Sequence, residues 1–560
     1  MRVNKSVHIY LAVGLLTLFF SVNSLAQNES EANKTIILGE EFNVGWLHKS
    51  LFGSQWRNLW TTPISIPILD LNTFQGGLTP QFDGQNSESP FLKFIGNDER
   101  YWKFTPINKD FFELLPDALQ ITFVNNILED QVSSVNPFAK IINSELLNAV
   151  GFDLSIPIFI VLPEDEALNK FSGQVGFLES CNNPYEVEEI NRITELFNSI
   201  ENVNNIKIDS KEFLKIRLMN ILLGNWDRNI NKWKWDEIEN QNIFYWKPHP
   251  NNSDQAFAKF DGLLPYSASF IFPQLTSFND NLAHAGNYTQ SGRYIDRRFL
   301  TELIKSQWDS ITVYIQQSIT DDVIVSAVNK IPSGNKPEVK NKIINTIKNR
   351  RDKLNELCDV YYSIINKVAD IYGSNNNDSV TVNRISNDIT SVELYSSGNN
   401  AINTSEAYFK KQFDNNITEE IRIYLLDGDD EVIIKGEVDD SPLIRILGGP
   451  GDDKFEDKSI VNGFFLSITP FKKSEKKTIF YDSDNNSSFI KSLSTSIDTN
   501  QFDESILITE NYEQSQRDRG SSWGFLPEVG YSTTDGVLIG GMVDLFSFNF
   551  RKGPTNIYRV

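Results

Sequence analysis

The sequence predicts an α+β protein in which a mixed region of helices and strands is followed by a region built almost wholly of strands. Before residue 373, apolar residues recur at helical spacing in several segments. Beyond it, short β-rich runs alternate with turns rich in Gly, Asn and Asp. A length of 560 residues favours two to four domains. We expect an α+β domain at 27–372, a β-rich module with stacked or solenoid-like strands at 373–522, and terminal strands at 523–560.

The first 26 residues have the pattern of a secretory signal peptide. Arg2 and Lys5 form a charged start, 9–22 is apolar, and 24–26 places small residues at the cleavage position. We expect the mature chain to begin near Gln27 and to be exported to the periplasm or the outer membrane. The alternative is a retained membrane anchor, for which the apolar run is short.

The charge balance argues against one class of partner. The formal net charge is -22 and the pI is about 4.8, so we expect no nucleic-acid partner, since phosphate contacts need a basic surface. Acidity of this degree suits a soluble surface and divalent cations. The two cysteines, Cys181 and Cys358, allow one disulfide or two separate thiols.

In the first region, strands and helices can be placed in order from their patterns. Strands are expected at 64–71, 91–95, 100–107, 156–163 and 174–178. Helices are expected at 144–151, 186–199, 210–223, 297–318 and 336–372, with helical periodicity also at 111–143. Residues 96–99 have the composition of a hairpin turn.

The stretch 221–260 holds the clearest candidate site. A polar loop at 224–229 follows an apolar helix, and alternating aromatic residues at 233–246 indicate two short strands. Asp227 and Asp254 lie at the two ends of this hairpin and can meet in space. Phosphoryl transfer needs one Asp to accept the proton of the attacking hydroxyl and another to hold a metal on the phosphates. The alternative is a solvated loop followed by a turn aspartate.

Two lysines could contact phosphates near this site. Lys103 lies on the second strand of the predicted hairpin at 91–107, and Lys109 follows that strand. A polar loop ahead of such a hairpin can cover a nucleotide. The alternative is that either lysine is an ordinary solvated side chain.

The β-rich region contains two similar turns. Strands are expected at 379–382, 391–395, 420–426, 431–435, 443–447 and 464–468. The turns at 427–430 and 449–453 are 23 residues apart, which indicates successive rungs of a stacked structure. Stacked Gly-Asp-Asp turns can bind Ca²⁺ through carboxylate and carbonyl oxygens. The candidate ligands are Asp429, Asp430, Asp452 and Asp453, with plain turn chemistry as the alternative.

The terminal segment has a different pattern. Residues 529–531 and 537–550 alternate apolar and polar side chains and are flanked by Gly. This alternation is typical of outer-membrane strands. Two strands cannot close a barrel, so either the natural protein is longer or these strands pack on the β-rich module.

The central motifs resemble those of atypical kinases, namely the HipA-like, phosphatidylinositol-kinase and secretory-pathway casein-kinase families. Residues 224–229 and 253–254 resemble their catalytic and metal loops, and 148–157 resembles the step from a helix into the hinge strand. The resemblance implies a two-lobed fold that binds ATP with Mg²⁺ or Mn²⁺. It makes Asp227 the base beside Arg228 of the catalytic loop, Asp254 the metal ligand and Asp130 the acidic partner of Lys103 or Lys109.

Three positions depart from the kinase pattern. Asn225 replaces an expected Asp, Asn229 replaces a His, and Lys232 replaces a neutral or acidic metal ligand. An ammonium group at position 232 would repel Mg²⁺, although it could itself neutralise phosphate charge. A kinase-like domain with these changes is therefore expected to be a pseudokinase.

The whole chain also resembles exported bacterial proteins that end in a BamA-type, or surface-antigen, outer-membrane barrel. Many of these also carry a calcineurin-like phosphoesterase, whose motifs are absent here. The matching pieces are 76–80, 108–110, 130–133, 224–257, 448–452 and, as the start of a barrel, 524–553. This resemblance implies association with the outer membrane or with a membrane protein.

Two functions follow from these observations. The favoured one is an exported, outer-membrane-associated protein with a non-catalytic kinase-like domain. The alternative is an active metal-dependent ATP phosphotransferase that works outside the cytoplasm. The sequence leaves open whether the protein is an enzyme.

Overall fold

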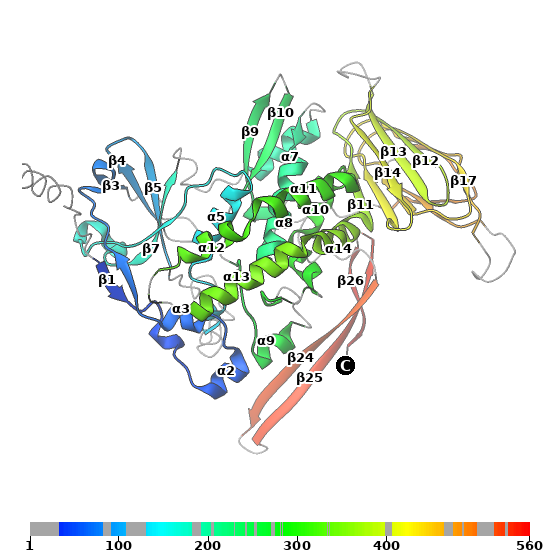
Figure 1. Ribbon diagram of the computed structural model, residues 1–560. Helices are drawn as coiled ribbons and strands as arrows, with labels where there is room; N and C mark the ends of the chain where they lie inside the picture. The colour runs from blue at the N-terminus through cyan, green and yellow to red at the C-terminus, as the bar shows by residue number, and fades with distance from the viewer. Residues whose placement is uncertain are drawn as a thin grey trace, which may run out of the picture.

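The structure is a computed structural model, and the predicted α+β class is confirmed by its mixture of helices and strands (Figure 1). It describes residues 33–81, 91–107, 130–181, 192–202, 206–228, 230–240, 243–250, 255–269, 275–280, 282, 284–332, 334, 337–397, 406–463, 474–483, 486–500, 520–532, 536–550 and 552–559. The predicted strand at 464–468 and most of the predicted helical pattern at 111–143 lie outside the described residues.

The first described segment is a strand pair with a 3-10 turn and two short helices, and it precedes the main sheet of this region. Strand β1 (Asn33–Ile36) pairs antiparallel with β2 (Ile64–Pro67). Between them lie the 3-10 turn η1 (Glu40–Phe42) and the helices α2 (Trp46–Phe52) and α3 (Arg57–Thr61). The strand predicted at 64–71 is therefore shorter than expected.

A five-stranded antiparallel sheet comes next. Its members are β3 (Leu78–Gln81), β4 (Leu92–Gly96), β5 (Tyr101–Pro106), β6 (Ile158–Val161) and β7 (Val175–Cys181), in the spatial order β3-β4-β5-β7-β6. The predicted hairpin of β4 and β5 is confirmed, with the Gly96 N–H donating to the Arg100 carbonyl across the turn at 2.8 Å. Helix α5 (Ala139–Ala149) packs on one face, where Phe138 contacts the ring of Phe159.

The other side of this region is helical. Its helices are α7 (Ile193–Asn202), α8 (Ser210–Leu223), α9 (Leu263–Ala268), α10 (Arg293–Leu300), α11 (Lys305–Ser318), α12 (Asp321–Asn329), α13 (Pro337–Asp352) and α14 (Leu354–Asn366). In the part of the chain that the structure describes, 3-10 turns also accompany the sheet and the helices, namely η2 (Phe74–Gly76), η5 (Val132–Ser134), η6 (Glu166–Phe171), η7 (Ile230–Lys232) and η8 (Ala285–Gly292). A small sheet of β8 (Lys207–Ile208), β9 (Lys234–Asn240) and β10 (Ile243–His249) confirms the hairpin expected from the aromatic residues. Helix α8 contacts α10, α11, α13 and α14, so it is buried on nearly all sides.

Two predicted helices are shorter than expected. The pattern at 297–318 belongs to α10 and α11, because residue Ile304 between them is extended. The long helix predicted at 336–372 is α13 and α14 followed by strand β11 (Val368–Tyr372). The last five residues leave the helix because they pair in parallel with β15 (Glu420–Tyr424), and this pairing buries Val368 and Ile371.

Beyond α14, strands form two sheets, in which the pairs β12-β13 and β13-β14 are antiparallel and the other pairs are parallel. One sheet has the order β11-β15-β18-β21-β23 and the other the order β14-β13-β12-β16-β19-β22. The remaining strands are β12 (Asp378–Arg384), β13 (Ile389–Ser396), β14 (Phe409–Asp414), β16 (Glu431–Lys435), β17 (Glu437–Val438), β18 (Leu443–Leu447), β19 (Lys454–Asp457), β20 (Ile460–Val461), β21 (Thr478–Tyr481), β22 (Ser488–Ile490) and β23 (Thr495–Asp498). We call residues 368–500 the β stack.

The predicted stacking of successive rungs is confirmed. Glu420 of β15 is the register partner of Leu443, and Glu431 of β16 is the partner of Lys454. Both pairs are one 23-residue repeat apart. The side chains of Val432, Ile444 and similar residues fill the space between the two sheets.

The β stack is fixed to the helical side by buried polar contacts. The ammonium group of Lys411 donates to the carbonyls of Thr301 and Leu303 and, at 2.8 Å, to the side chain of Asn366. Arg298 of α10 lies 3.9 Å from the ring of Tyr372. In Figure 1 the helices therefore stand between the five-stranded sheet and the β stack.

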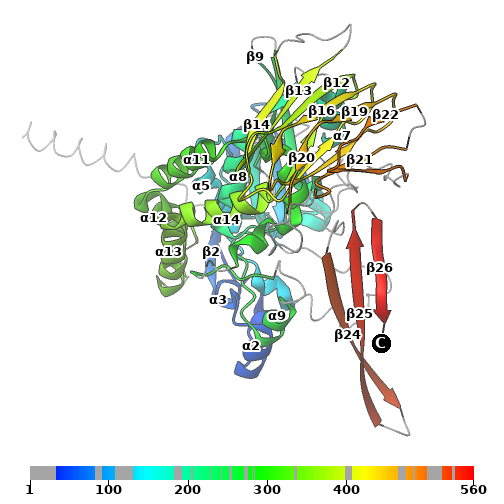
Figure 2. The same ribbon diagram turned by 90° about the vertical axis from the view of Figure 1, so that its right-hand side faces the viewer.

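The last described strands form a long antiparallel sheet. They are β24 (Gly520–Ser532), β25 (Gly536–Asn549) and β26 (Lys552–Arg559), and they lie beside one end of the β stack (Figure 2). Phe550 contacts the ring of Tyr481 at 5.0 Å and the guanidinium of Arg445 at 4.5 Å. The predicted strand pair is therefore confirmed, and it packs on the stack at Phe550.

Candidate functional site

The loop at 224–228 is set by the end of α8. Asp209 caps the start of this helix by accepting the Glu212 N–H at 3.0 Å, and Gly224 ends it in the left-handed conformation with φ 69°. Arg350 of α13 donates to the carbonyls of Ile221 and Leu222 at 2.6 and 2.7 Å. These contacts satisfy the last carbonyls of α8, so the position of the loop that follows is firmly determined.

Asp227, the predicted base, lies in this loop with a half-buried side chain. One of its carboxylate oxygens is 3.9 Å from the ammonium nitrogen of Lys232, which lies in the 3-10 turn before β9. The lysine that the sequence places at a metal-ligand position is thus an ion-pair partner of the predicted base. A metal bound to this carboxylate would face a positive charge.

Arg228 points into the protein. Its side chain is 1% exposed, its guanidinium donates to Asn220 of α8 at 3.0 Å, and it lies 5.6 Å from the ring of Trp233. Its backbone N–H donates to Ser291 at 3.0 Å. These are the contacts of a residue that holds the loop in place. Its assignment to the catalytic loop stays a prediction.

Lys103 lies on the third strand of the sheet, as expected, but its ammonium group is largely covered. The side chain is 7% exposed, and the nitrogen lies 4.5 Å from the centre of the Phe91 ring. Its register partner on β7 is Glu179, which pairs with Lys140 of α5. The rival lysine, Lys109, lies outside the described residues.

Asp130 has Arg57 and His48 as partners, and its predicted pairing with Lys103 or Lys109 stays a prediction. Both of its oxygens accept from the Arg57 guanidinium at 2.8 Å, and His48 lies 2.9 Å away. Although burial acts in the opposite direction, the hydrogen bonds from Arg57 and His48 hold the pKa of Asp130 below its usual value. The carboxylate therefore joins the segment at 130–134 to α2 and α3.

Asp254, the predicted metal ligand, lies outside the described residues, as does Asn229. Three residues after Asp254, the Phe257 N–H donates to the Leu223 carbonyl at 2.8 Å. The Trp56 indole donates to the Phe257 carbonyl at 2.6 Å. The segment that leaves Asp254 is thus hydrogen-bonded to the last residue of α8, next to the loop that holds Asp227.

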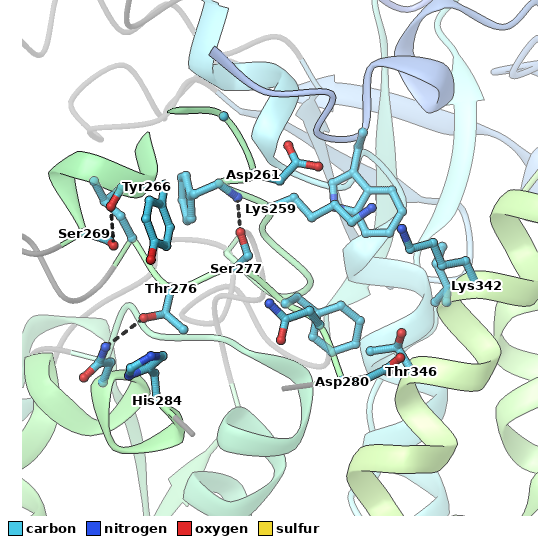
Figure 3. A pocket seen from close by; sticks show the side chains of 18 of the residues that line it. Lys259, Asp261, Tyr266, Ser269, Thr276, Ser277, Asp280, His284, Lys342 and Thr346 are labelled. Carbon is cyan, nitrogen blue, oxygen red and sulfur yellow. Dashed lines mark hydrogen bonds between the residues drawn. The ribbon is translucent and has the colours of Figure 1, made fainter. Parts of the chain in front are cut away.

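A cavity of about 860 Å³ lies just beyond this segment, and sequence reasoning missed it (Figure 3). It is lined by Trp56, by residues of 259–287 and by one face of α13. The lining includes Lys259, Asp261, Tyr266, Ser269, Thr276, Ser277, Asp280, His284, Lys342 and Thr346. No motif indicates it, because its two lysines come from segments far apart in the chain.

The four predicted calcium ligands lie on two stacked turns. Asp430 and Asp453 are each 1% exposed. An oxygen of Asp430 accepts the N–H of Asp378 at 2.7 Å, and an oxygen of Asp453 accepts the N–H of Asp430 at 2.9 Å. On the exposed side, Asp429 accepts the N–H of Asp452 at 2.9 Å. These carboxylates act as rungs that tie each turn to its neighbour.

The described residues contain no group of three or more His, Cys, Asp or Glu side chains that could hold a metal ion. Among the helices that the structure describes, none has both the length and the apolar character needed to cross a bilayer. Cys181 and Cys358 do not form a disulfide with each other.

Comparisons with known proteins give little beyond the geometry. No known family matches the sequence, and no curated protein matches it. One similar solved structure is a proinflammatory kinase, CtkA, from Helicobacter pylori. It is 10% identical, its match covers 53% of this chain and 98% of that chain, and the TM-score is 0.29. We draw nothing about activity from a match at this level.

Proposed function

We propose that the first region is a kinase-like two-lobed domain that no longer transfers phosphate, in an exported protein that associates with the outer membrane. The order of its elements supports the kinase-like part. The sheet has the order β3-β4-β5-β7-β6, with Lys103 on its third strand and α5 directly after it in the described chain. A buried helix, the loop with Asp227 and a further acid then follow. Kinase motifs occur in this sequence of lysine, helix, catalytic loop and metal loop.

The observation that best supports the loss of phosphate transfer is the ion pair between Asp227 and Lys232. Their charged atoms are 3.9 Å apart. Catalysis would require Asp227 to receive a proton from a hydroxyl while a cation neutralises the phosphates. Lys232 instead neutralises the base and would repel a divalent cation close to it.

The first helix that the structure describes after β5, α5, also departs from the kinase pattern. In kinases a Glu of the helix that follows the lysine strand holds the phosphate lysine. Here α5 has one acid, Glu145, and it pairs with Lys330 of α12. Lys140 of the same helix pairs with Glu179 of β7. The helix therefore carries the lysine and the strand the acid, which is the reverse of the kinase arrangement. Glu145 of α5 therefore does not hold Lys103 in the orientation that phosphate contact requires.

Nucleotide binding and phosphate transfer by the purified full chain would test this proposal. We expect the thermal midpoint to rise by less than about 1 °C with millimolar ATP and Mg²⁺ or Mn²⁺, because mass action stabilises only proteins that bind the ligand. Lys232→Asn should increase metal-dependent nucleotide binding, and Lys247→Asn, on β10, is the matched control. A metal-dependent rise in the parent that Asp254→Ala abolishes would overturn the proposal and favour the active phosphotransferase.

The association with the outer membrane draws on the two ends of the chain. The first 26 residues have a signal-peptide pattern. On the long sheet of β24–β26, Trp523 is the register partner of Leu545, and both are exposed, as is Val543 on the same face. An exposed apolar face on long antiparallel strands suits a lipid environment. Fractionation of cells expressing the full chain would test this, and a soluble periplasmic protein would contradict it.

A further inference from the structure

Two lysines meet on the wall of the 860 Å³ cavity. Lys259 follows the segment anchored on α8, and its backbone N–H donates to the Ser134 carbonyl at 2.9 Å. Lys342 comes from the first half of α13. Figure 3 shows the two side chains pointing toward one another. Lys259 also lies 3.9 Å from the centre of the Trp56 ring.

Lys259 is half-buried and Lys342 is exposed, and this pair differs from several covered arginines of the protein, which have an acid as partner. Arg57 has Asp130, Arg217 has Asp296 and Arg298 has Glu201 as ion-pair partners. Among the described residues, neither Lys259 nor Lys342 forms an ion pair. Burial, followed by the charge of Lys342, lowers the pKa of Lys259 to about 8.

The acids of the cavity offset this repulsion only in part. Asp261 is the nearest source of compensation for Lys259, but one of its oxygens accepts the Gln55 N–H at 2.8 Å. Asp280 and His284 lie on the lining farther along the chain. Two ammonium groups that face each other on the wall of a cavity would both be stabilised by one bound dianion.

The rest of the lining suits an organic ligand. The volume lies within the range of small-molecule sites, about 300–1,000 Å³. Aromatic side chains line the same cavity as the lysines, including Trp56, Tyr266 and Phe278. Hydroxyls of Thr276 and Ser277 are already hydrogen-bonded to Asn287 and to the Phe260 N–H. The cavity therefore offers a positive end and an aromatic surface.

We propose that this cavity binds a small phosphate monoester, with Lys259 and Lys342 together holding the phosphate and the aromatic residues covering the organic group. Neither Lys103 nor Asp227 lines the cavity. The cavity thus lies apart from these two described residues of the predicted nucleotide site, and the proposal does not depend on the proposed function of that site.

Calorimetric titration of the full chain with phenyl phosphate, without metal at pH 7, would test the proposal. We expect binding that Lys259→Met and Lys342→Met each weaken by about tenfold or more, because each removes one charge-assisted contact. Lys348→Met is the matched control, since this lysine lies on the same helix and pairs with Asp321 outside the cavity. Inorganic phosphate should bind more weakly than phenyl phosphate, because it lacks the aromatic group.

Three results would overturn the proposal. One is that the parent does not bind phenyl phosphate at 10 mM, a concentration about ten times the Kd of a ligand that binds with millimolar affinity. Another is equal affinity in the parent and the two lysine variants. The third is benzoate binding as tightly as phenyl phosphate, which would remove the preference for a dianion.

The variant Lys342→Glu guards against loss of folding. Lys342 is exposed, so the substitution is tolerated sterically, and the new carboxylate would pair with Lys259. We expect this variant to melt at a higher temperature than the parent and to lose phenyl phosphate binding. A folded Lys342→Glu protein that still bound phenyl phosphate would contradict the role of the lysine pair.

Discussion

The loop after α8 and the turns of the β stack both contain aspartates, but they hold these carboxylates by different means. In the loop after α8, Asp227 is half-buried and pairs with the side chain of Lys232 at 3.9 Å. In the β stack, Asp430 and Asp453 are buried, and each accepts a backbone N–H from the preceding rung.

This difference predicts which aspartates contribute strongly to the free energy of unfolding and which can be substituted with little effect on it. A buried backbone N–H that loses its acceptor costs about 1–3 kcal/mol. A partly exposed ion pair contributes about 0–1 kcal/mol. We therefore expect substitutions of the stack aspartates to act on stability, and substitutions at Asp227 and Lys232 to act on binding alone.

The largest expected effect is a pH dependence that comes from Asp430. Burial, with Asp453 and Asp378 nearby, raises the pKa of Asp430 to about 9. The folded stack therefore holds a proton that the unfolded chain releases above its ordinary pKa near 3.8. The stabilisation is complete below that value and is lost as the pH rises through 9, by up to about 1.4 kcal/mol per pH unit.

Asp430→Asn isolates this effect, because the amide keeps the acceptor for Asp378 and does not titrate. We expect the parent to lose stability relative to this variant as the pH rises from 5 to 7. Burial lowers the pKa of Lys411 to about 7 and would act with the opposite sign above that pH, so the comparison stops there. Hydrogen exchange of peptides from 420–461 is the measurement. Identical pH slopes for the two proteins would show that Asp430 is ionised in the folded state.

Asp453→Ala should give the next largest effect. It removes the acceptor of the buried Asp430 N–H, and we expect a loss of about 2 kcal/mol in the stability of the stack. Asp453→Asn keeps an oxygen in the same place and should cost less. The stack contains no tryptophan, so circular dichroism at strand wavelengths, compared with tryptophan fluorescence, would localise the loss. A change in the tryptophan fluorescence transition alone would place the loss of stability outside the β stack and contradict the prediction.

Much of this arrangement could be predicted from local signals. Helix α8, its end at Gly224 and the hairpin of β9 and β10 follow from apolar spacing, a glycine and alternating aromatic residues. The 23-residue spacing of the two turns gave the parallel register directly. In each case the residues that determine the structure are close together in sequence.

The contacts that no local signal predicted involve partners that are distant in sequence. Asp130 is an acid near a predicted helix in the sequence, but its partner Arg57 lies on a separate segment. The residues of β11 continue the helical spacing of α14, and only their pairing with β15 makes them a strand. The lysine pair of the cavity requires α13 to pack beside the segment after Phe257, which no local pattern encodes.

A smaller effect is expected at the other loop. Asp227→Ala removes one partner of a partly exposed ion pair, so the free energy of unfolding should change by less than about 1 kcal/mol. Tryptophan fluorescence suits this measurement, because Trp226 and Trp233 flank the loop. A loss as large as that of Asp453→Ala would mean that Asp227 has a structural role equal to that of the stack aspartates.

Calcium gives the smallest expected change and the sharpest test of the comparison. The carboxylates of Asp430 and Asp453 already accept backbone N–H groups, and the raised pKa of Asp430 keeps it protonated at neutral pH. We therefore expect 1 mM Ca²⁺ to stabilise the stack by no more than about 0.4 kcal/mol, which is the value for a site of millimolar affinity. A larger rise that EDTA reverses, and that Asp430→Asn and Asp453→Asn abolish, would establish the calcium site predicted from the turns. It would also reverse the pH dependence, since a bound cation requires ionised carboxylates and therefore favours the stack as the pH rises.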